Sequence, residues 1–193
     1  MWDGYRVQKA FMSGCIPILR RGMETTDMEF LMAIVIMLLD QGTKIWAERA
    51  LSRQPLVLIP GALELTYLEN RGAVWGLMQG WRVVFLVAPF IFLGILVWFY
   101  AKKRKDMTAL TRIILSLLFS GAIGNLIDRV FLGYVRDMIY FSLINFPVFN
   151  VADSAITIAA ALLVIETFFV KGKTTTFDLM EACFPKKEKK TEP

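Results

Sequence analysis

Long apolar stretches alternate with shorter polar ones along the chain, and four of them are long enough to cross a membrane. They cover residues 28–46, 81–101, 109–131 and 150–170. An α-helix needs about 20 mostly apolar residues to span the hydrocarbon core of a bilayer. Composition agrees, since 56% of the residues are hydrophobic and the mean hydropathy is +0.52. The pattern predicts an all-α polytopic membrane protein with four transmembrane helices.

Two segments outside the predicted helices carry shorter apolar patterns. Leu56–Ile59 is an apolar run, and after a Pro60–Gly61 turn signal residues 63–68 alternate between apolar and polar side chains. Alternation with a period of two, next to a turn, predicts a β-hairpin or a small curved sheet. Residues 137–146 are mostly apolar or aromatic and too few to cross, so we expect them to lie along the membrane surface.

The basic residues are unevenly distributed. With the N-terminus inside the cell, 15 of the 22 Lys and Arg residues fall in residues 1–27, 102–112 and 171–193. Because Lys and Arg are enriched in cytoplasmic loops, both termini are predicted to be cytoplasmic, and the net charge of +5 reflects topology rather than a nucleic-acid partner. We divide the chain into a cytoplasmic N-terminal extension (1–27), a membrane domain (28–170) and a mobile, Lys-rich cytoplasmic tail (171–193).

The chain contains no histidine, which narrows the chemistry that it can carry out. Histidine is the most frequent general base, a ligand in the commonest zinc sites and a member of Ser-His pairs. Cys15 and Cys183 both fall on the predicted cytoplasmic side, where neither a disulfide nor a metal site is expected. If the chain is an enzyme, its acid/base catalysis falls to carboxylates.

Four aspartates from separate parts of the sequence are predicted to meet at the outer face of the membrane. Asp40 and Asp128 lie near the outer ends of the first and third helices, Asp137 lies in the segment that follows, and Asp153 begins the fourth helix. Carboxylates at membrane depth are costly, so their default interpretation is functional. Two facing carboxylates share one proton and can deprotonate water while protonating a carbonyl group, as in peptide hydrolysis.

Two of these positions also have a structural interpretation based on helix spacing. Asp40 and Lys44 are four residues apart, in the order that favours an ion pair on a helix. Asn150 and Asp153 have the spacing of a capping box at a helix N-terminus.

Structural alternatives exist for other polar positions as well. Asp128 could pair with its neighbour Arg129, and residues 70–72 (NRG) are typical of a turn. Residues 121–124, with two glycines and an alanine, are typical of close helix packing. Asp137 has no evident capping role.

Five sequence blocks occur in an order that matches a known family. They are residues 40–44 (DQGTK), 70–76 (NRGAVWG), 121–129 (GAIGNLIDR), 133–137 (GYVRD) and 149–154 (FNVADS). Together with the predicted topology they resemble lipoprotein signal peptidase (signal peptidase II), the bacterial inner-membrane aspartic protease. The resemblance covers about residues 30–170, and five blocks in order are far more specific than any one of them.

The resemblance implies that Asp137 and Asp153 are the catalytic dyad, whereas Asp128 corresponds to a supporting position. Other positions matching those that line or organise the family's substrate site are Asp40, Lys44, Asn70, Gly72, Asn125, Arg129 and Asn150. The implied reaction removes the signal peptide of a diacylglyceryl-modified prolipoprotein by cleaving before the lipidated cysteine. No metal or organic cofactor is implied.

The resemblance also implies an architecture and a location. A β-cradle and an interfacial helix are expected at the periplasmic or extracellular face, in agreement with the patterns over residues 55–69 and 137–146. The expected partners are the prolipoprotein and membrane lipids. We expect a monomer in the bacterial cytoplasmic (inner) membrane, with its active site at the outer face.

Two blocks depart from the family pattern without removing a catalytic position. Arg136 stands where the family often has Val, immediately before Asp137. A cation there would lower the pKa of Asp137 if it pointed inward, or it would face the lipid phosphates. Val74 and Trp75 replace the more usual Ala-Phe and would reshape the substrate pocket.

Two other functions fit part of the pattern. A small proton-coupled carrier or channel would use the same acids as a relay, but it predicts acids distributed across the membrane depth. A noncatalytic assembly subunit would make the glycine-rich packing surface the main feature and would tolerate Asp-to-Asn changes. The gathering of acids at one face favours the peptidase.

Overall fold

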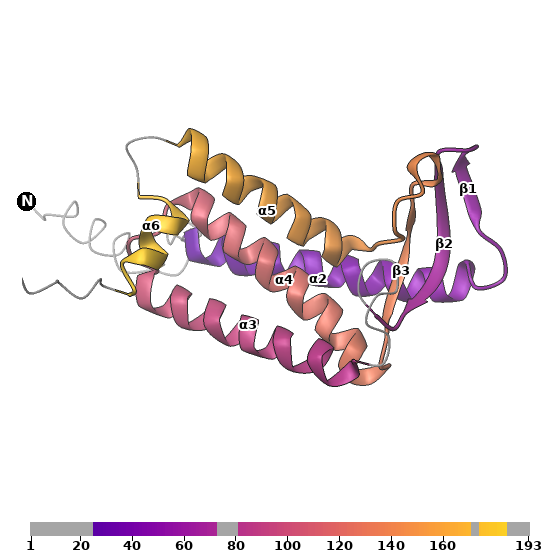
Figure 1. Ribbon diagram of the computed structural model, residues 1–193, viewed down its shortest axis with the longest axis horizontal. Helices are drawn as coiled ribbons and strands as arrows, with labels where there is room; N and C mark the ends of the chain where they lie inside the picture. Colours follow the sequence, from indigo (N-terminus) through magenta and orange to yellow (C-terminus); the bar gives the residue numbers. More distant parts are fainter. Residues whose placement is uncertain (1–24, 73–80, 171–173, 185–193) are drawn as a thin grey trace, which may run out of the picture.

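Four long helices form a bundle, and a small antiparallel sheet lies across one end of it (Figure 1). The computed structural model describes residues 25–72, 81–170 and 174–184. All four long helices are sufficiently long and apolar to cross a membrane, and this confirms the predicted membrane architecture. They are α2 (Thr25–Ala50), α3 (Arg82–Lys103), α4 (Ala109–Phe131) and α5 (Val151–Phe169).

Some predictions concern parts of the chain outside the described residues. They are the N-terminal extension up to residue 24, with Cys15, the positions Val74 and Trp75, and residues 171–173 and 185–193 of the tail.

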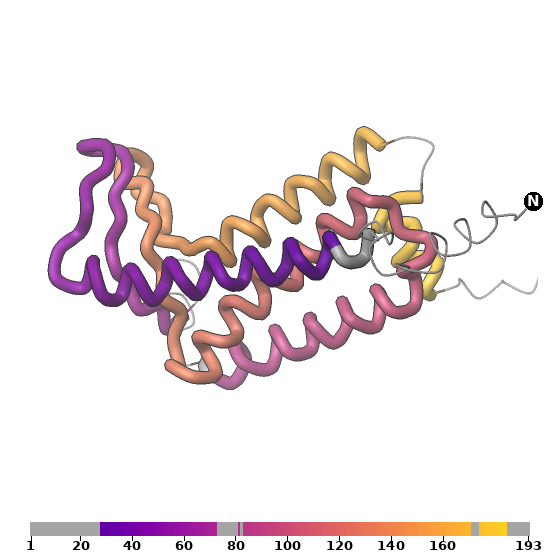
Figure 2. Tube along the Cα trace, turned by 180° about the vertical axis from the view of Figure 1, so that it is seen from behind, coloured from indigo at the N-terminus to yellow at the C-terminus, as the bar shows by residue number. Residues whose placement is uncertain are grey.

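Helix α4 lies at the centre of the bundle, and α2, α3 and α5 pack around it (Figures 1 and 2). Of its apolar span 56% is buried, against 11% for α3. Small residues allow this close packing. A Cβ atom added at Gly121 would lie 2.5 Å from the carbonyl oxygen of Ala152 on α5, and one at Gly124 would lie 2.6 Å from Oδ2 of Asp40 on α2. The predicted packing role of these glycines is confirmed.

The three strands of the sheet are antiparallel, in the spatial order β1 (Leu56–Ile59), β2 (Leu63–Asn70) and β3 (Val135–Tyr140). The β1–β2 hairpin confirms the predicted one, and Gly61 in its turn has a φ of +71°, which glycine adopts without strain. Strand β2 pairs Leu68 with Asp137 and Asn70 with Val135. The sheet therefore brings Asn70, at the start of the second sequence block, next to the last residues of the fourth.

The prediction of an interfacial helix over residues 137–146 is wrong for the first part of that segment. Val135–Tyr140 forms strand β3, and helical structure begins later, in the 3-10 turn η2 (Ser142–Ile144). The first four residues of β3 are all buried, and a strand buried on both faces lacks the alternation by which strands are identified. The apolar side chains that follow are exposed, namely Phe141, Leu143, Ile144 and Phe146.

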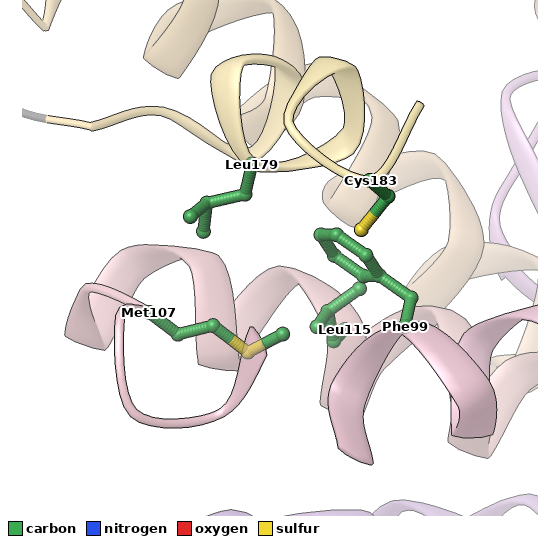
Figure 3. Close-up of a cluster of buried hydrophobic side chains, with 5 residues drawn as sticks. All are labelled: Phe99, Met107, Leu115, Leu179 and Cys183. Atoms are coloured by element: carbon green, nitrogen blue, oxygen red, sulfur yellow. The ribbon is translucent and has the colours of Figure 1, made fainter. Parts of the chain in front are cut away.

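Part of the predicted mobile tail is folded. After α5 the chain returns to the bundle as α6 (Thr176–Glu181), at the end away from the sheet (Figure 1). Leu179 and Cys183 pack with three residues of α3, α4 and the turn between them (Figure 3), which are Phe99, Met107 and Leu115. The prediction is wrong for this segment, because tertiary contacts stabilise a helix too short to be recognised from its sequence.

Glu166 of α5 connects α6 to α4. Its buried carboxylate accepts hydrogen bonds from the backbone N of Thr176 and from Oγ1 of Thr111, both at 2.9 Å. Both donors belong to buried residues. A buried donor left without an acceptor costs about 1–3 kcal/mol, so the Glu166 carboxylate stabilises the docked position of α6.

Replacing Glu166 by Ala is expected to lower the thermal unfolding temperature in detergent, whereas Glu166→Gln, which keeps one acceptor oxygen, should lower it less. The buried thiol of Cys183 reports the docking directly. In a Cys15→Ser background, Glu166→Ala should speed maleimide labelling of Cys183, and Thr167→Ala, on the exposed side of α5, should not. Unchanged labelling and unfolding would contradict this role of Glu166.

Candidate active site

Four aspartates meet at the sheet end of the bundle, each from a different element. Asp40 comes from α2, Asp128 from α4, Asp137 from β3 and Asp153 from the first turn of α5. The first three are almost fully buried, and Asp153 is partly exposed. Amide and cationic side chains link all four, as the following contacts show. The convergence predicted from the direction of the helices is therefore confirmed.

Asn150 connects the two candidate dyad residues. Its side-chain Nδ2 donates to Oδ1 of Asp137 at 2.7 Å, and its backbone N donates to Oδ2 of Asp153 at 3.3 Å. The backbone N of Asp153 donates to Oδ1 of Asn150 at 2.9 Å, which completes a capping box at the start of α5. The predicted capping box exists, and its contacts also bring the Asp153 carboxylate close to Asp137.

Asp137 is held by a second amide, from β2. Nδ2 of Asn70 donates to Oδ2 of Asp137 at 2.9 Å, and Oδ1 of Asn70 accepts from the backbone N of Gly72 at 3.0 Å. Gly72 therefore fixes which end of the Asn70 amide faces the carboxylate. Burial and the nearby charge of Asp153 raise the pKa of Asp137 to about 7, although the amide donors of Asn70 and Asn150 act in the opposite direction.

Asn125 of α4 holds Asp153 in a similar way. Its Nδ2 donates to Oδ1 of Asp153 at 2.7 Å, while its Oδ1 accepts from Nζ of Lys44 at 3.0 Å and from Nδ2 of Asn150 at 3.1 Å. Two donors on the oxygen fix the orientation of this amide. Lys44 also pairs with Asp40 at 2.8 Å, with both side chains fully buried. The predicted helix pair exists, and it orients the site.

Asp128 pairs with two cations, neither of which is Arg129. Nη2 of Arg136 lies 2.7 Å from its Oδ1, and Nζ of Lys44 lies 3.5 Å from its Oδ2. The predicted Asp128–Arg129 pair is therefore wrong. The two expectations for Arg136 are also wrong, because successive side chains of a strand point to opposite faces. The guanidinium of Arg136 contacts α2 and α4, on the face of β3 opposite Asp137.

Besides Arg136, two residues of this cluster, Gln41 and Glu48, were not among the predicted site residues. Nε2 of Gln41 donates to the carbonyl oxygen of Gly124 at 3.1 Å, and its Oε1 accepts from Nη2 of Arg136 at 3.1 Å. Oε2 of Glu48 accepts from Nη1 of Arg136 at 3.1 Å. Gln41, Lys44 and Glu48 follow one another at spacings of three and four residues, so helix periodicity could have placed them on one face.

Arg129 lies near the dyad candidates and contacts α3. Its guanidinium is 5.4 Å from the centroid of the Phe85 ring on α3, and it lines a small hollow together with Asn70 and Tyr134. It lies within electrostatic range of Asp137 and Asp153. A guanidinium in this place can bind a main-chain oxygen of a peptide next to the two carboxylates.

The chemistry open to this arrangement is acid/base catalysis by two carboxyl groups. Asp137 keeps a proton up to about pH 7, and a second carboxyl group close to it can act on the same water or carbonyl group. Within residues 25–72, 81–170 and 174–184, no three His, Cys, Asp or Glu side chains gather in an arrangement that could hold a metal ion.

Comparison with known proteins places the chain in a family. A family model described as signal peptidase (SPase) II matches residues 32–169. The chain belongs to the signal peptidase II family. Lipoprotein signal peptidase of Clostridium acetobutylicum is 40% identical over 142 residues, which are 72% of this chain and 92% of the relative. Lipoprotein signal peptidase of Streptococcus thermophilus is 41% identical over 128 residues, 66% of this chain and 83% of the relative.

A solved structure supports the same relationship. It is described as "Bacterial membrane enzyme structure by the in meso method at 2.3 A resolution", and it matches with a TM-score of 0.65 and 33% identity over 86% of this chain and 94% of that one. Membership of the signal peptidase II family makes the chain a membrane peptidase and confirms the resemblance drawn from the five blocks. The matched residues contain every predicted site residue and end with α5, so α6 lies beyond them.

Asn70 is expected to influence the pH range of activity. Its hydrogen bond favours the ionised form of Asp137, so Asn70→Ala should raise the pKa of that carboxyl group above about 7. If hydrolysis requires protonated Asp137, the alkaline limb of the kcat/KM profile then moves to higher pH. Cleavage rates measured from about pH 5 to 9 check this, with the exposed amide variant Gln54→Ala as control. A limb that stays in place or moves to lower pH would contradict the prediction.

Gly124→Ala is expected to displace groups that hold Asp153 in position. The new Cβ would lie 2.6 Å from Oδ2 of Asp40 and 3.1 Å from Cβ of Ala152, and Asp40 accepts a hydrogen bond from the backbone N of Ala152 at 2.9 Å. Displacing these groups should move Asp153 and lower the cleavage rate by roughly 10- to 100-fold. Gly42→Ala, where nothing lies within 4 Å of the added Cβ, is the matched control. Equal rates for the two variants would contradict the prediction.

Proposed function

We propose that the chain is an aspartic endopeptidase in which Asp137 and Asp153 form the catalytic dyad. The observation that carries the proposal is the position of Asn150, which hydrogen-bonds with both carboxyl groups. Two carboxyl groups held in this way share one proton at neutral pH, in agreement with the raised pKa of Asp137. Family membership supplies the reaction class, and the absence of histidine from the chain leaves the acid/base steps to these carboxyl groups.

The surroundings of the two carboxyl groups support different roles. Asp137 is only 1% exposed, which disfavours its charged form, so it holds the proton. Asp153 lies in the first turn of α5 and accepts a hydrogen bond from the backbone N of Asn150. A helix N-terminus stabilises negative charge. Asp153 is therefore the general base toward water, and Asp137 is the proton donor toward the carbonyl oxygen of the scissile bond.

Hydrolysis then takes two steps. Asp153 takes a proton from water as the water oxygen bonds to the carbonyl carbon, and Asp137 gives its proton to the carbonyl oxygen. In the second step the C–N bond breaks, the leaving nitrogen takes the proton from Asp153, and Asp137 recovers a proton from a hydroxyl group of the intermediate. Both carboxyl groups return to their starting forms. Asn70 and Arg129 hold the substrate backbone beside the dyad.

The proposed substrate is a prolipoprotein with a diacylglyceryl group on the cysteine that follows the cleaved bond. The relatives from Clostridium acetobutylicum and Streptococcus thermophilus are named lipoprotein signal peptidases. The dyad lies at one end of four apolar helices, near exposed apolar side chains of β1 and of residues 141–146. An apolar signal segment and its lipid can therefore stay in hydrocarbon while the scissile bond reaches the dyad.

We place the dyad at the outer face of the bacterial cytoplasmic membrane. A run of basic residues lies at the turn from α3 to α4, at the end of the bundle away from the sheet (Figure 1), and consists of Lys102, Lys103, Arg104 and Lys105. Because basic loops stay in the cytoplasm, the sheet then faces outward and both termini are cytoplasmic. The protein acts as a monomer, with membrane lipids as its other partners and without a cofactor or nucleic acid.

The dyad is tested by Asp137→Asn and Asp153→Asn, each compared with wild type at matched amounts of folded protein. Each variant should cleave purified diacylglyceryl-prolipoprotein at least roughly 1000-fold more slowly, because both steps need both carboxyl groups. Asp106→Asn, an exposed carboxylate in the α3–α4 turn, should cleave like wild type. Normal cleavage by both dyad variants would rule out the dyad. A folded wild type that cleaves no lipidated substrate would favour the alternative function, a proton-coupled carrier.

A further inference from the structure

Arg136 has many polar contacts at the sheet end, and the proposed reaction gives it no role. Nε and Nη2 of its guanidinium donate to the two oxygens of Asp128, at 3.2 and 2.7 Å. Nη2 also donates to Oε1 of Gln41, and Nη1 donates to Oε2 of Glu48, both at 3.1 Å. The backbone N of Arg136 donates to Oδ2 of Asp128 at 2.9 Å. The residue is 7% exposed.

These contacts join three elements. Arg136 belongs to β3, its carboxylate partner Asp128 to the last turn of α4, and its other two partners to α2. Met138 is two residues farther along and so on the same face of the strand, where it packs against Ala47 of α2. Asp137 lies between them on the opposite face, with its partners on β2 and at the start of α5. One face of β3 attaches the strand to the bundle, and the other presents the dyad residue.

We propose that Arg136 is a positioning residue, which fixes β3 against α2 and α4 and thereby holds Asp137 in place beside Asp153. The inference rests on the proposed dyad. The Cα atoms of Arg136 and Asp137 are only about 3.8 Å apart, so movement of the attachment point moves the catalytic carboxyl group directly. A displacement of ~1 Å can lower a rate by ~100-fold. Backbone hydrogen bonds hold β3 to β2 and to Phe149. Toward α2, however, the apolar contact of Met138 is not directional and fixes the strand less precisely than the guanidinium of Arg136.

Arg136 also provides the counter-charge of Asp128. Asp128 lies 2.7 Å from Arg136 and 3.5 Å from Lys44, and the closer guanidinium leaves Lys44 free to pair with Asp40 at 2.8 Å. Removal of Arg136 therefore has two separable consequences. A buried carboxylate loses its closer cation, which lowers stability, and β3 loses the side-chain part of its attachment to α2 and α4, which lowers the rate. Asp128→Asn relieves the first consequence and leaves the second.

The kinetic test compares Arg136→Met, Arg136→Lys and the double variant Arg136→Met/Asp128→Asn with wild type, as folded full-length proteins in detergent. For cleavage of diacylglyceryl-prolipoprotein, Arg136→Met should lower kcat roughly 10- to 100-fold and change KM less than about threefold. Arg136→Lys should recover part of kcat, since an ammonium group cannot bind both carboxylate oxygens in parallel. The double variant should regain the unfolding temperature of wild type but not its kcat. Arg53→Met, exposed in the loop before β1, is the control.

Amide hydrogen exchange adds a measurement that needs no substrate. In Arg136→Met and in the double variant, exchange over Val135–Tyr140 should be at least about 10-fold faster than in wild type, with the core of α4 unchanged. If Arg136→Met shows the same exchange rates and the same kcat as wild type, the inference is overturned. A double variant that regains kcat together with stability would also overturn it, because Arg136 would then only neutralise Asp128. Faster exchange in a protein whose wild type does not cleave would support the attachment of β3 and overturn the proposed function.

Discussion

The ammonium group of Lys44 is fully buried, and the arrangement of the sheet end depends on how this charge is satisfied. A charge removed from water without a partner costs several kcal/mol. Lys44 contacts the carboxylate of Asp40 at 2.8 Å, the side-chain oxygen of Asn125 at 3.0 Å and the carbonyl oxygen of Gly124 at 3.3 Å. These partners require α2 and α4 to approach closely, which a glycine at position 124 allows. The same contacts orient Asn125, and through it Asp153.

Apart from Arg129, the polar residues around the proposed dyad form two layers, of which one is charged and the other neutral. The inner layer is charged and balanced within itself, and consists of Asp40, Lys44, Asp128 and Arg136. The layer that touches the dyad is neutral, and consists of Asn70, Asn125 and Asn150. Amides hold a carboxyl group in place through directional hydrogen bonds without adding a full positive charge. A lysine or arginine in direct contact with Asp137 would lower the pKa of that carboxyl group more than an amide does, and would remove the proton that the proposed mechanism requires there.

The parts of the fold that could be predicted from the sequence are those determined by local properties. Hydropathy over a long window identified the four helices, and spacing within a few residues identified the Asp40–Lys44 pair and the Asn150–Asp153 capping box. The remaining features depend on contacts distant in the sequence. Glu48 and Gln41 are 88 and 95 residues from Arg136, so nothing near Arg136 indicates where its side chain lies. The sequence did not predict strand β3, because a strand buried on both faces lacks the alternation of apolar and polar residues.

The two ends of the bundle are held together by different kinds of contact. At the end away from the sheet, apolar side chains pack around Phe99 and Leu115, and the short helix α6 docks through one buried carboxylate. Apolar packing holds helices together, but it is not directional and leaves side chains some freedom. The catalysis proposed for Asp137 and Asp153 needs the positions of their carboxyl groups fixed to a fraction of an ångström. The hydrogen bonds that give this precision at the sheet end come from the protein itself, and they draw on α2, α4, α5, β2 and β3 together.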